Sequence, residues 1–195
     1  IGRIGRSPIN VPALIARLRS YPRRRDREIL GVGFQLGFSI GVEHAVDRNR
    51  VPKNLASARS EPEVVRQKIA AEVAAGRFAG PFDQPPLEAM LFSPLGLVPK
   101  REIGKFRLIH HLSWPVGRGV NAAIPDSVAA VKYTKFDTVI SKIKAFGTGT
   151  LLWKADIKDA FRLLPVRQAD QRFLGFTFDE KFFLDLCLSM GLRSS

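Results

Sequence analysis

The sequence has few of the residues that build metal clusters or covalent cross-links. Its 195 residues include one cysteine, Cys187, and three histidines, His44, His110 and His111. A single cysteine excludes an internal disulfide and a zinc site built on a cysteine cluster. Its apolar neighbours predict a buried structural thiol. The histidines lack the spacing of a metalloenzyme helix, and His110 and His111, as neighbours in an expected strand, should point to opposite faces.

Long apolar runs are also absent. The nearest candidate, residues 29–42, is interrupted by four glycines, a glutamine and a serine, so it falls short of a membrane span. No signal peptide is visible. We therefore expect an intracellular protein, cytoplasmic or nuclear and not secreted, with no membrane partner.

Acidic residues are scarce relative to basic ones. The chain has 18 Asp and Glu against 31 Lys and Arg, a net charge of +13, and an apolar content of 45% that suits a folded globular protein. This excess of positive charge favours an acidic polymer as partner, because phosphate neutralisation releases counterions. Charge alone leaves an anionic membrane surface or simple solubility open as alternatives.

The positive charge is densest in residues 1–30. This stretch contains Arg3, Arg6, Arg17, Arg19, Arg23, Arg24, Arg25 and Arg27 against only Asp26 and Glu28. It is either an arm that contacts nucleic-acid backbone or a solvated basic surface. Asn10 and Pro12 predict a short capped helix that ends at Tyr21. The glycines of residues 31–38 do not match a dinucleotide-binding loop, because the third comes one residue late and no βαβ unit surrounds them.

Two further helices follow from capping and periodicity. A capping box at Ser60 and the spacing of Val65, Ile69 and Val73 predict a helix that ends at Gly76. Its charged side, with Arg66 and Lys68, is expected to be solvated. A second amphipathic helix is predicted over 136–146, closed by Gly147. Prolines make 79–86 a connector that is too stiff for a helix or a central strand, and a glycine- and proline-rich loop is expected over 114–125.

A β-hairpin is predicted in the middle of the chain. Its strands should run over 95–99 and 106–112, with a turn at 102–104. Lys100, Lys105 and Arg107 would then lie together near its tip. This cluster is either an anion-binding site or an ordinary basic hairpin tip.

The stretch from Thr150 to Pro165 contains the most informative motif. Residues 151–155 have the apolar character of a buried strand, and Asp156 is the first carboxylate at its expected end, where it could reach a metal or act only as a turn or cap residue. Asp159 follows three residues later. Short strands are then predicted over 161–166, 173–178 and 181–188, with Asp179 and Glu180 as a tight turn.

Four ordered segments resemble the reverse transcriptases of DIRS-type retrotransposons. They are Leu-Gly-Leu-Val-Pro-Lys at 95–100, Phe-Arg-Leu-Ile-His-His-Leu-Ser at 106–113, Lys-Ala-Asp-Ile-Lys-Asp-Ala-Phe-Arg-Leu-Leu-Pro at 154–165 and Met-Gly-Leu-Arg-Ser-Ser at 190–195. The resemblance is strong from about Ser93 and looser back to about Ser7. Ser189 departs from it, since the family usually has proline there.

The resemblance implies an α+β fold, a right-hand polymerase with fingers and the first part of a palm whose antiparallel sheet is backed by helices. The corresponding regions are a basic N-terminal region (1–58), a fingers subdomain with the basic hairpin (59–148) and a partial palm subdomain (149–195). The implied activity is RNA-directed DNA polymerisation by two-metal nucleotidyl transfer. The implied partners are an RNA template, a DNA primer and a deoxynucleoside triphosphate.

The resemblance also implies roles for particular residues. Asp156 would bind catalytic Mg²⁺ with help from the Ile157 carbonyl. Lys100 and Arg107 would hold the triphosphate, because the guanidinium of an arginine forks onto phosphate oxygens and a lysine adds a mobile point charge. The other expected nucleotide contacts are the backbone amides of Asp159 and Ala160, the aromatic gate Phe161, and Met190 and Gly191.

Two Mg²⁺ ions need more carboxylates than this motif provides. The family supplies them from a later Tyr/Phe-x-Asp-Asp hairpin, and no Asp-Asp pair occurs in this chain. Asp170, Asp179 and Asp185 are isolated and are expected to be turn or surface residues. We therefore expect a fragment of a polymerase that is inactive by itself.

Two other functions fit parts of the sequence. The first is a non-catalytic, basic nucleic-acid-binding remnant, which needs only the excess of arginine and lysine. The second is an unrelated metal-dependent phosphotransferase built on Asp156 and Asp159, for which the basic hairpin would be a coincidence.

Overall fold

The computed structural model describes residues 3–43, 50–129 and 133–193. The helices are α1 (Val11–Leu18), α2 (Arg24–Leu36), α3 (Ala56–Ser60), α4 (Pro62–Ala74), η1 (Val120–Ala123), α5 (Asp126–Ala129), α6 (Phe136–Phe146), η2 (Ala160–Leu163) and α7 (Gln168–Gln171), where η marks a 3-10 helix. The strands are β1 (Phe78–Phe82), β2 (Leu95–Pro99), β3 (Phe106–His110), β4 (Gly175–Phe178) and β5 (Lys181–Asp185). The predicted α+β class is confirmed. Within the described ranges no helix is both long and apolar enough to cross a membrane.

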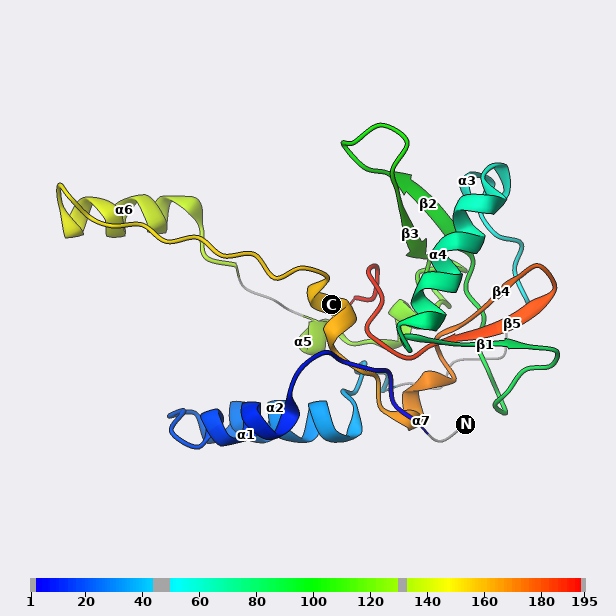
Figure 1. The fold of residues 1–195 in the computed structure, drawn as a ribbon, viewed down its shortest axis with the longest axis horizontal. Coiled ribbons are helices and arrows are strands. Elements are labelled where there is room, and N and C mark those ends of the chain that lie inside the picture. The colour runs from blue at the N-terminus through cyan, green and yellow to red at the C-terminus, as the bar shows by residue number, and fades with distance from the viewer. Residues whose placement is uncertain (1–2, 44–49, 130–132, 194–195) are drawn as a thin grey trace.

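The strands form two antiparallel sheets. One has the order β1-β5-β4, and the other is the hairpin β2-β3. Helix α4 contacts both β1 and β3, and Figure 1 shows it lying beside the two sheets. This helix therefore connects two sheets that share no strand.

Apolar residues under α4 hold these parts together. The buried cluster comprises Ala58, Val65, Ile69, Phe78, Leu95, Leu97, Phe176 and Phe183. Val65 and Ile69 are one helical turn apart, as the sequence predicts. The rings of Phe176 and Phe183 stack with centroids 5.2 Å apart. Burial of this cluster holds α4 against the sheets.

The predicted helix at α4 is confirmed, but its capping box is not. The side chain of Ser60 donates a hydrogen bond to the carbonyl of Ser57, 3.2 Å away, within the short helix α3. The N-cap of α4 is Glu61, which makes no side-chain capping bond, and Pro62 occupies the first helical position. Proline is favoured there because the first-turn N–H groups have no intrahelical partner.

Both predicted hairpin turns are confirmed. Strand β2 pairs with β3 from Leu95 opposite His110 to Pro99 opposite Phe106, so β3 ends two residues earlier than predicted. Between β4 and β5, Asp179 and Glu180 have φ angles of 47° and 59°. Two consecutive left-handed residues are what a tight two-residue hairpin loop requires.

The connector predicted over 79–86 is wrong at its start, where β1 runs to Phe82. Among the strands that the structure describes, β1 pairs only with β5 and is an edge strand, and its pairing is irregular between Ala79 and Phe82. Pro81 can sit there because an edge strand does not need every N–H for the ladder. The expectation that this stretch is not a central strand holds.

The predicted buried strand over 151–155 is wrong. These residues have no regular structure, and the side chains of Leu151, Leu152 and Trp153 are 95%, 71% and 89% exposed. Figure 1 shows them running back from α6, which projects away from the sheets. An apolar run forms a buried strand only where another layer covers it, and in the described part of the chain none does.

The predicted strand over 161–166 is also wrong. Its first residues belong to η2, and only its end makes isolated bridges, between Pro165 and Cys187 and between Val166 and Phe38. The latter bridge attaches the N-terminal helices to the body of the protein. The amide of Phe38 donates to the carbonyl of Pro165 at 2.7 Å, and the amide of Arg167 donates to Phe38 at 3.0 Å.

The N-terminal region contains two helices where the sequence predicts one. In α1 the Asn10 side chain accepts a hydrogen bond from the Ala13 amide at 3.0 Å, which confirms the predicted cap. The second helix, α2, was not predicted. It includes Gly31 and Gly33, so the rejected dinucleotide-binding loop is indeed absent from this stretch. Gly33 leaves room for the ring of Phe38, which a side chain would displace.

Asp170 is buried, which corrects its expected position at a turn or surface. It is 3% exposed, and it accepts hydrogen bonds from the Ile40 amide at 2.9 Å and the Ser39 hydroxyl at 3.2 Å. Arg167 pairs with it at 2.8 Å. This carboxylate fixes the segment after α2 against a second apolar cluster, which comprises Ile40, Leu91, Leu112, Val120, Ile124, Val166, Phe173, Leu174, Leu188 and Leu192.

Candidate functional site

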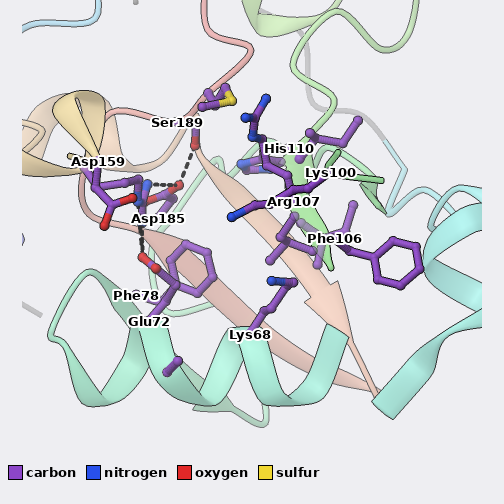
Figure 2. A pocket seen from close by; sticks show the side chains of 16 residues that line it. Lys68, Glu72, Phe78, Lys100, Phe106, Arg107, His110, Asp159, Asp185 and Ser189 are labelled. Carbon is purple, nitrogen blue, oxygen red and sulfur yellow. Dashed lines mark hydrogen bonds and ion pairs between the residues drawn. The ribbon is translucent and has the colours of Figure 1, made fainter. Parts of the chain in front are cut away.

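A pocket of about 280 Å³ lies between α4, the β2-β3 hairpin and the end of β5 (Figure 2). The lining residues are Lys68, Ala71, Glu72, Phe78, Leu95, Lys100, Phe106, Arg107, Leu108, Ile109, His110, Asp159, Arg162, Asp185, Ser189 and Met190. The hairpin contributes both an apolar wall and cationic side chains. The lining therefore offers a ligand both charged and apolar contacts.

Three lining cations come from two separate elements. Lys100 and Arg107 belong to the hairpin, and Lys68 extends toward them from α4 (Figure 2). Burial lowers the pKa of Lys68, and the charge of Lys100 lowers it further. None of the three pairs with a carboxylate among the described residues. Their mutual repulsion is relieved by an anion, so the site favours one.

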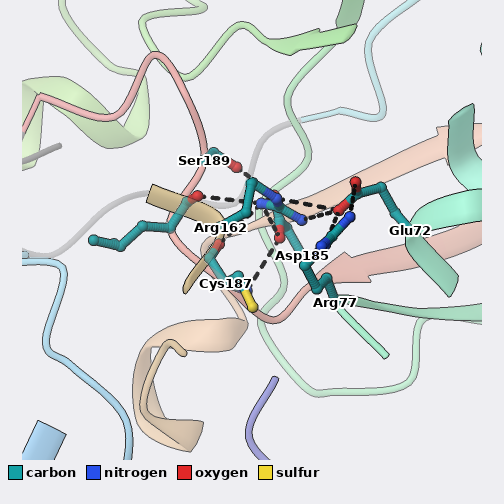
Figure 3. A network of polar contacts seen from close by, with 7 residues as sticks. Glu72, Arg77, Arg162, Asp185, Cys187 and Ser189 are labelled. Carbon is teal, nitrogen blue, oxygen red and sulfur yellow. Dashed lines mark hydrogen bonds and ion pairs between the residues drawn. The ribbon is translucent and has the colours of Figure 1, made fainter. Parts of the chain in front are cut away.

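Arg162 neutralises two of the three lining carboxylates. Its side chain is 16% exposed and contacts Glu72 and Asp185, each at 2.8 Å (Figure 3). Arg77 also pairs with Glu72, at 2.7 Å. The network thus contains two arginines and two carboxylates and carries no net charge. The unpaired cations nearby set the sign of the pocket.

The same arginine joins segments that are distant in the sequence. Glu72 lies on α4, Arg162 on η2, and Asp185 at the end of β5. The guanidinium also donates to the carbonyls of Cys187 at 3.4 Å and Leu188 at 3.2 Å. It lies over the ring of Phe78, 5.2 Å from the centroid, in a cation–π contact.

Asp185 is 2% exposed, which corrects its expected position at the surface. Besides Arg162, its carboxylate accepts hydrogen bonds from the Ser189 hydroxyl and from the Cys187 amide, the latter at 3.1 Å. A buried carboxylate persists only with such partners, because its desolvation is costly. Asp185 therefore orders the segment that leads to Met190.

The network shifts the pKa values of its members. Burial alone would raise the pKa of Glu72, but Arg77 and Arg162 outweigh it and hold this pKa below its ordinary value. For Arg162, burial is outweighed by Asp185 and Glu72, which raise its pKa. Burial raises the pKa of the Cys187 thiol to about 12, and the residue is fully buried, so the predicted buried thiol is confirmed.

His110 presents a buried nitrogen without a partner. Its Nε2 must donate to the Gly175 carbonyl, 3.1 Å away, which leaves Nδ1 as an acceptor with no hydrogen-bond partner in the described part of the chain. Burial lowers the pKa of His110, so the ring is neutral. Among the residues that the structure describes, no group of three His, Cys, Asp or Glu side chains could hold a metal ion.

Only some of the predicted site residues meet at the pocket. Those that line it are Lys100, Arg107, Asp159 and Met190, whereas Asp156, Ile157, Ala160, Phe161 and Gly191 are outside the lining. Asp156 lies in the exposed segment after α6. Phe161 packs against the apolar cluster around Ile40, and the Gly191 carbonyl accepts a hydrogen bond from Asn121 at 2.8 Å.

Sequence reasoning missed four charged residues that line the pocket, among them Glu72, to which it gave no role. Lys68 was expected to be solvated, Asp185 to be at the surface, and Arg162 was quoted only as part of a motif. The spacing of Lys68 and Glu72, four residues apart on one helix, places both on the same face and is the one signal available. The pairing of Glu72 and Asp185 through Arg162 joins positions up to 113 residues apart and has no local signature.

Comparisons with known proteins support the fold. No protein-family profile matches the chain, and no curated protein sequence matches it. A foamy viral protease-reverse transcriptase in complex with double-stranded DNA matches 95% of the chain and 33% of its own length, with 16% identity and a TM-score of 0.54. A second such complex matches 98% of the chain and 40% of its own length, with 16% identity and a TM-score of 0.51. The native prototype foamy virus protease-reverse transcriptase matches 98% of the chain and 26% of its own length, with 13% identity and a TM-score of 0.51.

These similarities establish a reverse-transcriptase-like fold. Identities of 13–16% relate the chain to these proteins by fold alone. The chain spans between about a quarter and two fifths of the length of the similar chains.

Arg162 and Arg66 provide a matched test of the buried network. Each contacts two carboxylates, but Arg66 and its partners Glu63 and Asp179 are exposed. We expect Arg162→Gln to lower the free energy of unfolding by about 3–5 kcal/mol, because it removes the arginine partner of the buried Asp185 and leaves Glu72 with Arg77 alone. Arg66→Gln should cost about 1 kcal/mol or less. Urea unfolding followed by circular dichroism measures both, and equal losses would contradict the account.

The lowered pKa of Glu72 predicts a pH dependence of stability. A carboxylate with a depressed folded-state pKa stabilises the fold above its unfolded pKa, near 4.5, and this contribution is lost as the pH falls through the folded value. The free energy of unfolding should therefore decline below about pH 4.5, and less steeply for Glu72→Gln. Urea titrations at a series of pH values test this. If the free energy of unfolding falls equally steeply with pH in the two proteins, Arg77 and Arg162 do not lower the pKa of Glu72.

Proposed function

We propose that the chain is the nucleotide-binding part of a reverse-transcriptase-type polymerase and that its pocket receives the phosphates of a deoxynucleoside triphosphate. The observation that carries this proposal is the group of three unpaired cations, Lys68, Lys100 and Arg107, beside an apolar wall. The reverse-transcriptase-like fold supports it. Charge-assisted bonds to phosphate are stronger than neutral ones, and a guanidinium can fork onto two oxygens.

In this proposal Lys100 and Arg107 bind phosphate oxygens, and Lys68 adds a third contact from α4. The backbone amides of Asp159 and Ala160 would lie under the triphosphate. Asp159 supports this role because it lines the pocket with a left-handed backbone, φ 53°, that turns the chain into η2.

The remaining roles depend on residues near the pocket. Met190 lines it, which supports a role beside the nucleotide or template, and Gly191 follows directly. Phe161 is proposed as the gate against a ribose 2′-hydroxyl. Its ring now packs against the apolar cluster around Ile40, so this role requires the nucleotide sugar to lie against η2.

Mg²⁺ is proposed as the cofactor, with Asp156 and the Ile157 carbonyl as ligands. Magnesium in such sites is held by one or two carboxylates together with substrate phosphates. The described residues do not fit a two-ion site, since Glu72 and Asp185 are committed to Arg162 and Asp156 is outside the pocket. We therefore propose that the chain does not polymerise alone.

RNA template and DNA primer are the proposed macromolecular partners. The net charge of +13 supports a polyanion, and two of the similar structures are described as complexes with double-stranded DNA. An origin in a DIRS-type retrotransposon and an intracellular location are further proposals, which depend on the sequence motifs and composition.

A non-catalytic nucleic-acid-binding protein is the second candidate. It is favoured by the position of Asp156, whose segment is exposed and has no regular structure. In that case phosphate binding would need no metal ligand.

The role of Lys68 predicts a selective loss of nucleotide binding. Lys68→Gln should weaken binding of a deoxynucleoside triphosphate by about 10-fold or more, because one charge-assisted contact is lost. Lys105→Gln is the matched control, since Lys105 lies in the turn between β2 and β3, is not part of the pocket lining and pairs with Glu102 at 2.9 Å. Isothermal titration calorimetry without metal measures both. Equal losses of nucleotide affinity in the two variants would show that only net charge matters and would refute binding at the pocket.

Asp156→Asn separates the two candidate functions. If Asp156 is a metal ligand, the variant should lose the Mg²⁺-dependent increase in nucleotide affinity and keep the metal-independent part. An unchanged Mg²⁺ response would favour the non-catalytic protein. In a primer-extension assay the 195 residues should add no nucleotide with Mg²⁺, and synthesis would refute the proposed lack of activity.

A further inference from the structure

The two N-terminal helices form a hairpin with a free end. Helices α1 and α2 contact each other, and the turn that joins them lies at the end pointing away from the sheets (Figure 1). The guanidinium of Arg27 donates to the Arg19 carbonyl at 2.8 Å and ties the two helices together across this turn. The opposite end is attached to the body of the protein through Phe38. The free end is therefore an ordered projection.

Six arginines gather at this free end. We call them the arginine cap, and they are Arg17, Arg19, Arg23, Arg24, Arg25 and Arg27. The only carboxylates within the same stretch are Asp26 and Glu28. The hairpin brings the arginines at the end of α1 beside those at the start of α2, which the sequence alone could not establish.

The two carboxylates occupy only two of the arginines. Arg23 lies 3.8 Å from Asp26, and Arg24 lies 2.8 Å from Glu28, with exposed side chains in both pairs. Such exposed pairs contribute little and exchange readily for a stronger anion. Arg17, Arg19 and Arg25 are exposed and form no ion pair within the described residues. These three guanidinium groups are available to a ligand.

We propose that the arginine cap is a second phosphate-binding surface, separate from the pocket, that binds the backbone of a nucleic-acid strand without regard to sequence. This inference rests on the proposed function in one respect, the choice of nucleic acid as the anionic polymer. Guanidinium groups match phosphate oxygens in geometry. Figure 1 shows the turn between α1 and α2 and the β2-β3 hairpin on opposite sides of the molecule, so a long strand could reach both regions where a nucleotide could not. Binding at two sites raises affinity through effective concentration.

An anionic membrane is the competing partner for this surface. Ile29, Val32 and Leu36 are 50%, 54% and 67% exposed and share one face of α2. This apolar stripe runs toward the attached end of the helix, away from the turn. At a rise of about 1.5 Å per residue, the stripe begins about 6 Å along the axis from Arg25, at Ile29, and ends about 16 Å from it, at Leu36, so it extends away from the cap. The concentration of arginine at the turn favours phosphate backbone.

The test is the salt dependence of binding to a fluorescein-labelled 30-nucleotide oligothymidylate, followed by anisotropy. The slope of log K against log salt is negative, and each lost phosphate contact reduces its magnitude by about 0.7 for a single strand. The triple variant Arg17→Gln, Arg19→Gln and Arg25→Gln should reduce the magnitude of the slope by about 2. The control carries Lys135→Gln at the N-cap of α6 and Lys142→Gln and Lys144→Gln within α6, which together remove the same charge from another exposed element. Its slope should change by less than half as much; equal changes would overturn the proposal.

Two further measurements separate this inference from the proposed function. The arginine-cap variant should bind a deoxynucleoside triphosphate as tightly as the wild-type protein, because the pocket is unchanged. If the wild-type protein binds no nucleotide, the proposed function fails while the oligonucleotide result stands. Vesicles of phosphatidylserine and phosphatidylcholine provide the membrane test. Loss of vesicle binding in the cap variant with an unchanged oligonucleotide slope would overturn the proposal, and restoration of the slope by the corresponding Arg→Lys variant would support it.

Discussion

The buried guanidinium of Arg162 is the contact on which the arrangement of the pocket depends. It holds Glu72 of α4 and Asp185 of β5 at 2.8 Å each, and the nearly fully buried Asp185 would be costly to bury without it. The apolar cluster under α4 supplies burial but no fixed orientation, since such contacts are non-directional. The planar guanidinium adds direction. It sets η2, and with it Asp159, against the helix that also carries Lys68.

Charge neutrality inside the network gives the pocket its positive sign. Because Arg77 and Arg162 balance Glu72 and Asp185, no carboxylate of the network is left to pair with Lys68, Lys100 or Arg107. Helix α4 contributes to both parts, with Glu72 in the network and Lys68 one turn earlier at the pocket. A single helix thus stabilises the fold and presents a cation to a ligand.

Local signals predicted the local structure. Asn10 marked the start of α1, the spacing of Val65 and Ile69 marked α4, and Asp179 and Glu180 marked a hairpin turn. Burial was predicted less well, because it depends on what covers a residue. The apolar residues 151–155 are exposed, while Asp170 and Asp185, which the sequence placed at the surface, are buried with arginine partners. Lys100, Arg107 and Asp159 were predicted together and line one pocket, but Asp156 does not join them.

The central claim is that the pocket between α4 and the β2-β3 hairpin binds nucleotide phosphates through cations from both elements. The most direct measurement is a titration of ¹⁵N-labelled protein with a deoxynucleoside triphosphate, followed by two-dimensional NMR. The account predicts saturable shifts of amide signals that cluster on Lys68, Lys100, Arg107 and Asp159. Shifts that avoid these residues, or that gather only on the N-terminal arginines, would contradict it.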